Sequence, residues 1–248
     1  MEIDMMKEPD VMVYLMTGFL DSGKTQFLNF TLSQDYFQID GKTLLILCEE
    51  GEEQYDPMEM LKYGVVIETV EDKEDLTEEW LEEMNKKHEP ERVVIEYNGM
   101  WQVSEFEKMK LPAGWAIAQK ITTVDASTFQ MYLTNLKPLF VEMVKGAELV
   151  LFNRCEDKKP LAGYRRSVKV VSPQAEVIFE DENGEIENIF GDDVPYDLNA
   201  PVIEIPREDY LSSFHTISML MLFRLMTKIM VSGILICRSI RSAIKEKL

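Results

Sequence analysis

Residues 15–30 read LMTGFLDSGKTQFLNF, an apolar run that passes through a glycine turn into a half-apolar helical pattern. Within it, Gly18, Gly23, Lys24 and Thr25 match the pattern G-x-x-x-x-G-K-[ST] without a mismatch. A glycine-rich turn at the amino end of a helix presents backbone N–H groups to an anion. The lysine adds a charge for the outer phosphates, and the threonine adds a hydroxyl for Mg²⁺. The stretch therefore predicts a site for a nucleotide and Mg²⁺; the alternative is an inactive relic of such a loop.

Short apolar runs alternate with helical patterns along the first 180 residues. We expect strands at 11–18, 42–50, 65–70, 92–98, 116–126 and 148–153. We expect helices at 23–34, 76–88 and 128–146, and Pro138 is expected to kink or split the last of them. Strands that alternate with helices predict an α/β fold in three layers, with a mainly parallel sheet.

Polar residues stand at the ends of five predicted strands: Gly18, Glu49, Glu96, Asp125 and Asn153. Ligands of such folds lie at the carboxyl ends of the strands. We therefore expect these residues to converge on one edge of the sheet. A phosphate loop also needs a nearby acid for the metal or for water, and Glu96 is the leading candidate, with Glu49 beside the loop tip.

The composition predicts an acidic globular protein. The chain has 248 residues, 46% of them hydrophobic, which is enough for one sizeable core. A formal net charge of −19 argues against a nucleic-acid partner. Cys48, Cys155 and Cys237 are far apart and odd in number, which favours reduced thiols and a cytoplasmic location. The acidic start, MEIDMMKEPD, lacks the pattern of a secretory signal.

The composition changes toward the carboxyl terminus. Residues 176–190 read EVIFEDENGEIENIF, with a turn signal at 182–184 between two extended pieces. We predict a phosphate-loop domain at 1–180, an extended connector at 181–210 and a basic, apolar helical tail at 211–248. The tail has one acid and six bases (+5), and the remainder has 44 acids and 20 bases (−24). Four alternatives stay open for the tail: a helix docked on the domain, a helix on a membrane surface, a membrane span, or a reading-frame change.

Several spaced motifs resemble those of the CobW/HypB/UreG family of P-loop GTPases, in particular the CobW branch. The family loop T-G-F-L-G-S-G-K-T is similar to residues 17–25, and its switch segment N-E-F-G-E resembles residues 48–52, which an aspartate at 56 follows. Its Walker B element, E-x-x-G, matches residues 96–99, and its T-V-V-D-A element is similar to residues 123–126. The guanine-reading N-K-x-D resembles residues 153–156, and N-P-x-A resembles residues 172–175.

The resemblance implies GTP or GDP and Mg²⁺ as cofactors and assigns roles to residues. The implied nucleotide-binding residues are Gly18, Asp21, Ser22, Gly23, Lys24, Thr25, Gln26, Asn153, Arg154 and Glu156. The implied catalytic residues are Lys24, Glu49 and Glu96, and the implied metal ligands are Thr25, Glu49 and Glu96. Guanine is the favoured base. Adenine or weak discrimination is the alternative, because Glu156 replaces the usual aspartate and Arg154 replaces the usual lysine.

The family's metal motif, G-C-x-C-C, is missing. The best match is GVVIE at 64–68, which has no thiol. A soft-ligand zinc or cobalt site is therefore not expected there.

Two functions follow from these patterns. The first is a Mg²⁺-dependent GTPase with slow hydrolysis, whose switch at 48–56 acts on an unidentified client protein. The second is a nucleotide-sensing interaction module with little or no turnover. A nucleotide-dependent homodimer and contact of the tail with a membrane surface are further expectations about partners, and a degenerate fold that binds no nucleotide is a third reading.

Overall fold

A computed structural model describes residues 10–49, 51, 53–155, 161–181 and 184–185 of the chain. Glu156, the tail at 211–248 and nearly all of the predicted connector lie outside these residues. The boundaries proposed for the three regions therefore stay predictions.

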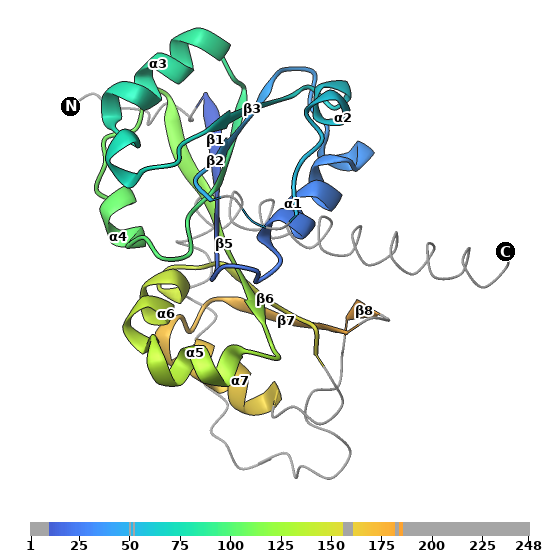
Figure 1. Ribbon diagram of the computed structural model, residues 1–248, viewed down its shortest axis with the longest axis vertical. Coiled ribbons are helices and arrows are strands. Elements are labelled where there is room, and N and C mark those ends of the chain that lie inside the picture. The colour runs from blue at the N-terminus through green and yellow to red at the C-terminus, as the bar shows by residue number, and fades with distance from the viewer. Residues whose placement is uncertain (1–9, 50, 52, 156–160, 182–183, 186–248) are drawn as a thin grey trace, which may run out of the picture. The chain divides into compact units, whose positions relative to one another are not determined.

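One sheet runs through the described part of the chain in the order β3-β2-β4-β1-β5-β6-β7-β8 (Figure 1). Seven strands are parallel, and only the two-residue β8 runs antiparallel, to β7. The strands are β1 (Val11–Thr17), β2 (Thr43–Leu47), β3 (Val65–Thr69), β4 (Arg92–Glu96), β5 (Trp115–Asp125), β6 (Leu149–Asn153), β7 (Glu176–Asp181) and β8 (Gly184–Glu185). The predicted mainly parallel sheet is confirmed, as are its six predicted strands and the two extended pieces around the turn signal.

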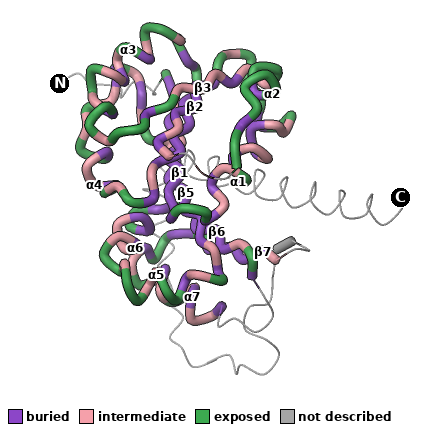
Figure 2. The backbone as a smooth tube through the Cα atoms, in the orientation of Figure 1, coloured by how far each residue is buried: buried purple, intermediate pink, exposed green. Residues whose placement is uncertain are grey.

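Helices cover both faces of this sheet (Figure 1). They are α1 (Lys24–Leu32), α2 (Pro57–Lys62), α3 (Glu78–His88), α4 (Val103–Phe106), α5 (Phe129–Asn135), α6 (Lys137–Val144) and α7 (Leu161–Val171), with short 3₁₀ turns at Asp35–Phe37 and Lys73–Asp75. The strands between them are buried along most of their length, as Figure 2 shows, and all five residues of β4 are buried. Because both faces are covered, strands such as β2 (TLLIL), β4 (RVVIE) and β6 (LVLFN) are largely apolar runs rather than alternating ones.

The predicted helices are confirmed, with one split as expected. Phe27, Leu28 and Thr31 form the buried side of α1. The pattern over 128–146 divides into α5 and α6 at Leu136, and Pro138 lies in the first turn of α6, where its missing N–H costs nothing.

Three further helices, α2, the four-residue α4 and α7, were not predicted. In α7, Leu161, Tyr164 and Val168 are buried at helical spacing, a signal that was present in the sequence. The shorter α2 depends on its cap: the Asp56 carboxylate accepts hydrogen bonds from the amides of Met58 and Glu59, and Pro57 occupies the first turn.

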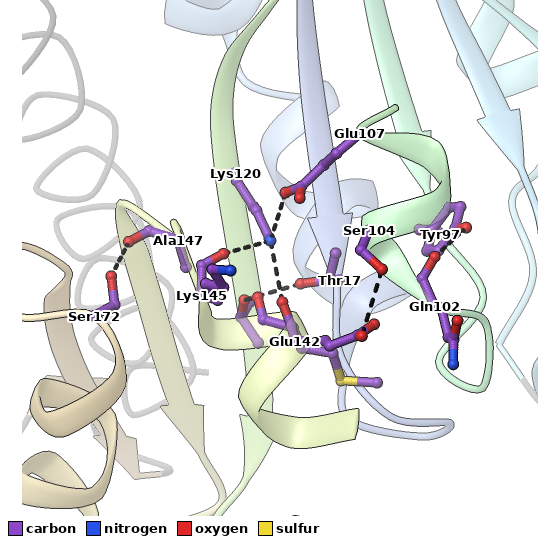
Figure 3. Close-up of polar contacts among 12 residues, drawn as sticks. Thr17, Tyr97, Gln102, Ser104, Glu107, Lys120, Glu142, Lys145, Ala147 and Ser172 are labelled. Atoms are coloured by element: carbon purple, nitrogen blue, oxygen red, sulfur yellow. Dashed lines mark hydrogen bonds and ion pairs between the residues drawn. The ribbon is translucent and has the colours of Figure 1, made fainter. Parts of the chain in front are cut away.

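A buried lysine ties two helices to the central part of the sheet (Figure 3). Lys120 of β5 is 4% exposed; its ammonium pairs with the Glu107 carboxylate at 2.9 Å and donates to the carbonyls of Glu142 and Lys145. Ser104 of α4 also donates to the Glu142 carboxylate of α6. A charge in a helix layer is tolerated only when it is paired in this way, and the pairing holds α4 and α6 beside β5.

No helix in the described residues has the length and apolar character that crossing a bilayer requires. The predicted tail at 211–248 lies outside the described residues.

Candidate functional site

The carboxyl ends of five neighbouring strands carry the polar residues that the sequence analysis brought together. Glu49 follows β2, Glu96 ends β4, Gly18 follows β1, Asp125 ends β5 and Asn153 ends β6. These strands are consecutive in the sheet, in the order β2-β4-β1-β5-β6. The predicted convergence on one edge is therefore confirmed.

The loop between β1 and α1 has a backbone that only glycine accommodates at two positions. Gly18 and Gly23 have φ angles of +146° and +90°. A Cβ at Gly18 would lie 2.5 Å from both the Ser22 hydroxyl and the Thr123 carbonyl oxygen, and one at Gly23 would lie 2.4 Å from the Asn153 side chain. Helix α1 starts at Lys24 without a side-chain cap, so its first N–H groups remain available to an anion.

Lys24 is buried beneath this loop, with 3% of its surface exposed. Its ammonium donates to the carbonyls of Gly18 and Phe19 at 3.0 Å each, and it pairs with a Glu49 oxygen at 2.5 Å. An ammonium has three N–H donors, so these contacts use all of them. The Glu49 carboxylate thus occupies the place on Lys24 that suits an anionic ligand.

Glu96 lies under the start of α1 and accepts hydrogen bonds on both carboxylate oxygens. Thr25 donates its hydroxyl to Oε1 at 2.7 Å, and Tyr55 donates its phenol to Oε2 at 2.5 Å. Burial raises the pKa of Glu96 above its usual range, although the hydrogen bonds from Tyr55 and Thr25 partly oppose the shift. The sequence analysis missed Tyr55. Its position as the one aromatic residue of the acidic switch segment 48–56 could have drawn attention to it.

The switch segment and the Walker B loop are bonded to each other. The Gly99 amide donates to Glu49 at 3.3 Å, and the Asn98 side chain donates to the Cys48 carbonyl at 3.0 Å. Gly99 also lies against the phosphate loop: a Cβ there would be 2.5 Å from the Gly18 carbonyl oxygen and 2.8 Å from Phe19 Cα. The loops after β1, β2 and β4 therefore pack as one unit.

At the other end of the loop, Asn153 donates its amide to the Ser22 carbonyl at 2.8 Å, while its Oδ1 is buried without a partner. Arg154 has a φ of +51° and reaches the Asp21 carbonyl at 2.8 Å and the Asp125 carboxylate at 2.6 Å. An unpaired buried oxygen beside a polar pocket is suited to a donor from a ligand.

A small cavity joins most of the predicted site residues. It has a volume of about 100 Å³ and is lined by Leu20, Asp21, Gly23, Lys24, Thr25, Gln26, Glu49, Gly51, Glu53, Glu96 and Arg154. Ser22 and Asn153 contact the loop without lining the cavity. Two larger hollows beside α3, of about 550 and 430 Å³, are lined mainly by Glu and Asp. Their acidic lining repels phosphate, so size alone does not mark the nucleotide site.

The small cavity offers oxygen atoms that could bind a hard cation as ligands. Thr25, Glu49 and Glu96 offer one hydroxyl and two carboxylates, which are the ligands that Mg²⁺ prefers. At the place of the family's thiol motif, Val65 is buried in β3 and Glu68 bonds to Lys87 and His88. The described residues there include no soft ligand.

Replacing Asp125 with asparagine is expected to lower the free energy of unfolding by about 0.5–1 kcal/mol at neutral pH, since water screens the half-exposed Arg154. Burial acts to raise the pKa of Asp125, but hydrogen bonds from Ser127 and Arg154 outweigh it and lower the pKa. The carboxylate therefore stabilises the fold above its unfolded pKa of about 3.9, and this contribution is lost as the pH falls through the lower folded value.

Urea unfolding of wild type and Asp125→Asn at neutral pH and near pH ~2.5 checks this expectation. The two proteins should differ at neutral pH and converge in acid. An equal difference at both pH values would show that the carboxylate charge contributes nothing.

The fold and its edge loop define a P-loop nucleotide-binding protein: a parallel α/β sheet whose first strand leads through G-x-x-x-x-G-K-T into a helix. The nucleotide-binding domain of the CobW/HypB/UreG family matches residues 12–179, and the chain belongs to this family. The predicted resemblance is therefore confirmed.

The fold is shared with a solved structure, the first of three similar structures. The Zn(II)-bound YjiA GTPase from E. coli has 22% sequence identity and a TM-score of 0.50, over 69% of this chain and 57% of that one. HypB from Archaeoglobus fulgidus has 16% identity and a TM-score of 0.49, over 70% and 82% of the two chains. HypB from Helicobacter pylori in complex with nickel has 13% identity and a TM-score of 0.47, over 70% and 80%. No curated protein sequence matches the chain.

Proposed function

We propose that this protein binds GTP and GDP together with Mg²⁺, hydrolyses GTP slowly, and acts as an accessory or maturation factor on a partner protein in the cytoplasm. The observation that carries the proposal is the conjunction of Lys24 and the Thr25–Glu96 pair at the open end of α1. Lys24 supplies a cation for phosphate, and the pair supplies the Thr25 hydroxyl for a metal with the Glu96 carboxylate beside it, within a single cavity. Membership of a nucleotide-binding family supports the same conclusion.

Each residue has a proposed role that follows from its place. Gly18, Asp21, Ser22 and Gly23 surround the phosphates with backbone groups, Lys24 neutralises their charge and Gln26 lines the same cavity. Thr25 supplies a hydroxyl to Mg²⁺, and Glu96 orients that hydroxyl and the water around the ion. Glu49, once it leaves Lys24, is a further carboxylate for metal or water. Bound Mg²⁺ would stabilise the negative charge that develops on the transferred phosphoryl group.

The base lies beyond Asn153 and Arg154 in this proposal. Asn153 fixes the loop through Ser22 and leaves Oδ1 for the ligand. Arg154, paired with Asp125 and the Asp21 carbonyl, forms a wall of the cavity. Guanine is preferred because the family's base-reading order is retained over residues 153–156, with Glu156 in the accepting position.

Calorimetric titration with GTP, GDP and ATP, each with and without Mg²⁺, tests the proposal. We expect binding of both guanine nucleotides, tighter with Mg²⁺, and ATP weaker by about tenfold or more, since each misplaced hydrogen bond leaves a buried polar group unpaired. Equal affinity for ATP would overturn the base assignment. No heat with any nucleotide, supported by equilibrium dialysis, would overturn the function.

One observation favours the second function, a nucleotide sensor with little turnover. Lys24 is already paired with Glu49, and Glu96 is already hydrogen-bonded to Tyr55. The groups proposed to act on phosphate and water are therefore occupied by side chains of the protein itself. Phosphate release separates the two functions: steady release of about 10⁻⁴ to 10⁻² s⁻¹, within the range of unassisted GTPases, supports the enzyme. Tight binding without release supports the sensor.

A further inference from the structure

Tyr55 is the one side chain from outside the phosphate loop that donates to Glu96 in the described residues. It lies in the segment between β2 and α2, and it is 9% exposed, while Glu96 is 3% exposed. Their contact of 2.5 Å, between phenol Oη and carboxylate Oε2, is in the range of the shortest and strongest hydroxyl–carboxylate hydrogen bonds. Tyr55 is therefore hydrogen-bonded to the carboxylate that the proposed function places beside the metal.

The two hydroxyl groups that donate to Glu96 come from different segments of the chain. Thr25 lies in the first turn of α1, and its hydroxyl bonds to Oε1 of Glu96 beside the phosphate loop. Tyr55 belongs to the switch segment, which contacts α1 through the 3.4 Å hydrogen bond from Asn29 to the Gln54 carbonyl and Lys24 through Glu49. The same segment accepts hydrogen bonds from Asn98 and Gly99 of the Walker B loop. Oε2 is thus held by a donor from a different segment of the chain than the donor on Oε1.

A hydrated divalent cation offers the same chemistry as the phenol. Its coordinated waters are strong O–H donors, and a second-sphere carboxylate accepts from them. We propose that Tyr55 is a positioning residue that sets the Mg²⁺ requirement of the site: its hydroxyl competes with the waters of magnesium for Oε2 of Glu96. The inference rests on the proposed function and deepens it, because it states which contact of the switch segment changes when nucleotide and Mg²⁺ bind.

The contact of Tyr55 also affects helix α2 through the next residue, Asp56. Asp56 follows Tyr55 and caps α2 through the amides of Met58 and Glu59, while its carbonyl accepts from Met60. When the Tyr55 phenol leaves Glu96, the capping residue Asp56 is no longer preceded by a residue that is hydrogen-bonded in the interior. Nucleotide and Mg²⁺ would thereby loosen α2, whose Met58 and Leu61 are 71% and 55% exposed.

The experiment compares Tyr55→Phe with wild type and with Tyr63→Phe. The phenylalanine keeps the buried ring and removes only the hydroxyl. Tyr63 is a matched control, since it follows α2 and, among the described residues, its hydroxyl bonds only to the exposed Glu59, at 3.4 Å. Retention of fluorescent GDP is measured against free Mg²⁺ from EDTA to millimolar concentrations.

For Tyr55→Phe we expect the Mg²⁺ concentration at half-maximal retention to fall about tenfold, because Oε2 is left without a donor until magnesium arrives. Retention in EDTA should stay within about twofold of wild type, because the phosphate contacts are unchanged. Tyr63→Phe should follow wild type. An unchanged or higher Mg²⁺ requirement in Tyr55→Phe would overturn the role of Tyr55 and leave the proposed function intact, whereas wild type that retains no GDP overturns the function itself.

Hydrogen exchange supplies a readout that does not depend on activity. The amides of Met58, Glu59 and Met60 should exchange faster in nucleotide-free Tyr55→Phe than in wild type, and Mg²⁺–GDP should speed their exchange in wild type only. Tyr55→Leu serves as a second variant if the phenylalanine protein is unstable. Equal exchange in all proteins with and without Mg²⁺–GDP contradicts the coupling to α2.

Discussion

Replacing Lys24 with alanine is expected to weaken the binding of GTP and GDP by about 100-fold or more, which corresponds to ~3 kcal/mol. The ammonium is the one cation buried in the loop, and it lies within hydrogen-bonding reach of the carbonyls of Gly18 and Phe19. Because Lys24 is 3% exposed, its contact with a phosphate is stronger than one at an open surface. Calorimetric titration measures the loss.

The substitution also removes the partner of Glu49, so the fold needs its own check. A carboxylate that is 10% exposed and loses its cation is destabilising, and thermal unfolding shows whether the protein remains folded. Lys24→Met, which keeps the apolar stem, is the second variant. Lys42→Ala is the control, because this lysine is exposed and lies at the start of β2, at the opposite end of the strand. Unchanged affinity in folded Lys24→Ala would mean that the loop does not bind phosphate.

Replacing Gly99 with alanine is expected to damage the same site by pushing on the backbone of the phosphate loop. The added methyl would meet the Gly18 carbonyl oxygen at 2.5 Å, Phe19 Cα at 2.8 Å and the Leu20 amide nitrogen at 2.9 Å. All three are backbone atoms of the phosphate loop, which cannot rotate away as a flexible side chain can. We expect a loss of stability of about 1–3 kcal/mol and a fall in nucleotide affinity of about tenfold or more, since the loop must shift.

The chain provides a matched control for this substitution. A Cβ at Gly51 would meet nothing within 4 Å, so Gly51→Ala adds the same methyl to open space. Thermal unfolding of the two variants separates a specific collision from a general effect of the methyl. Since Gly51 lines the nucleotide cavity, calorimetry compares Gly99→Ala with wild type. If Gly99→Ala binds nucleotide as wild type does, the packing of the Walker B loop on the phosphate loop is not important for binding.

Most of the fold could be predicted because its signals are local. A buried parallel strand requires an apolar run, and a helix requires apolar residues at three- and four-residue spacing. Both patterns were visible in β1, β2, β4 and α1. The short α2 was missed because its stability comes from one aspartate cap and one proline, which a periodicity of six residues cannot reveal.

Part of the site could also be predicted, because the loop chemistry lies in consecutive residues. Gly18 and Gly23 have the positive φ angles that a glycine turn before a helix requires, while the roles of Lys24 and Thr25 toward phosphate and Mg²⁺ stay predictions. The convergence of Glu49, Glu96, Asp125 and Asn153 followed from parallel strands ending at one edge. Which of these side chains contact one another did not follow, because strand order and loop path set those distances.

The sequence alone determined that this protein has a parallel α/β sheet with a phosphate loop after its first strand, since each of these features is written within a few neighbouring residues. Only the tertiary structure decided that Glu49 pairs with Lys24, that Tyr55 donates to Glu96, and that Gly99 supports the loop. Those contacts join residues 25 to 81 positions apart. Their geometry depends on how β1, β2 and β4 lie beside one another, and no local pattern specifies that arrangement.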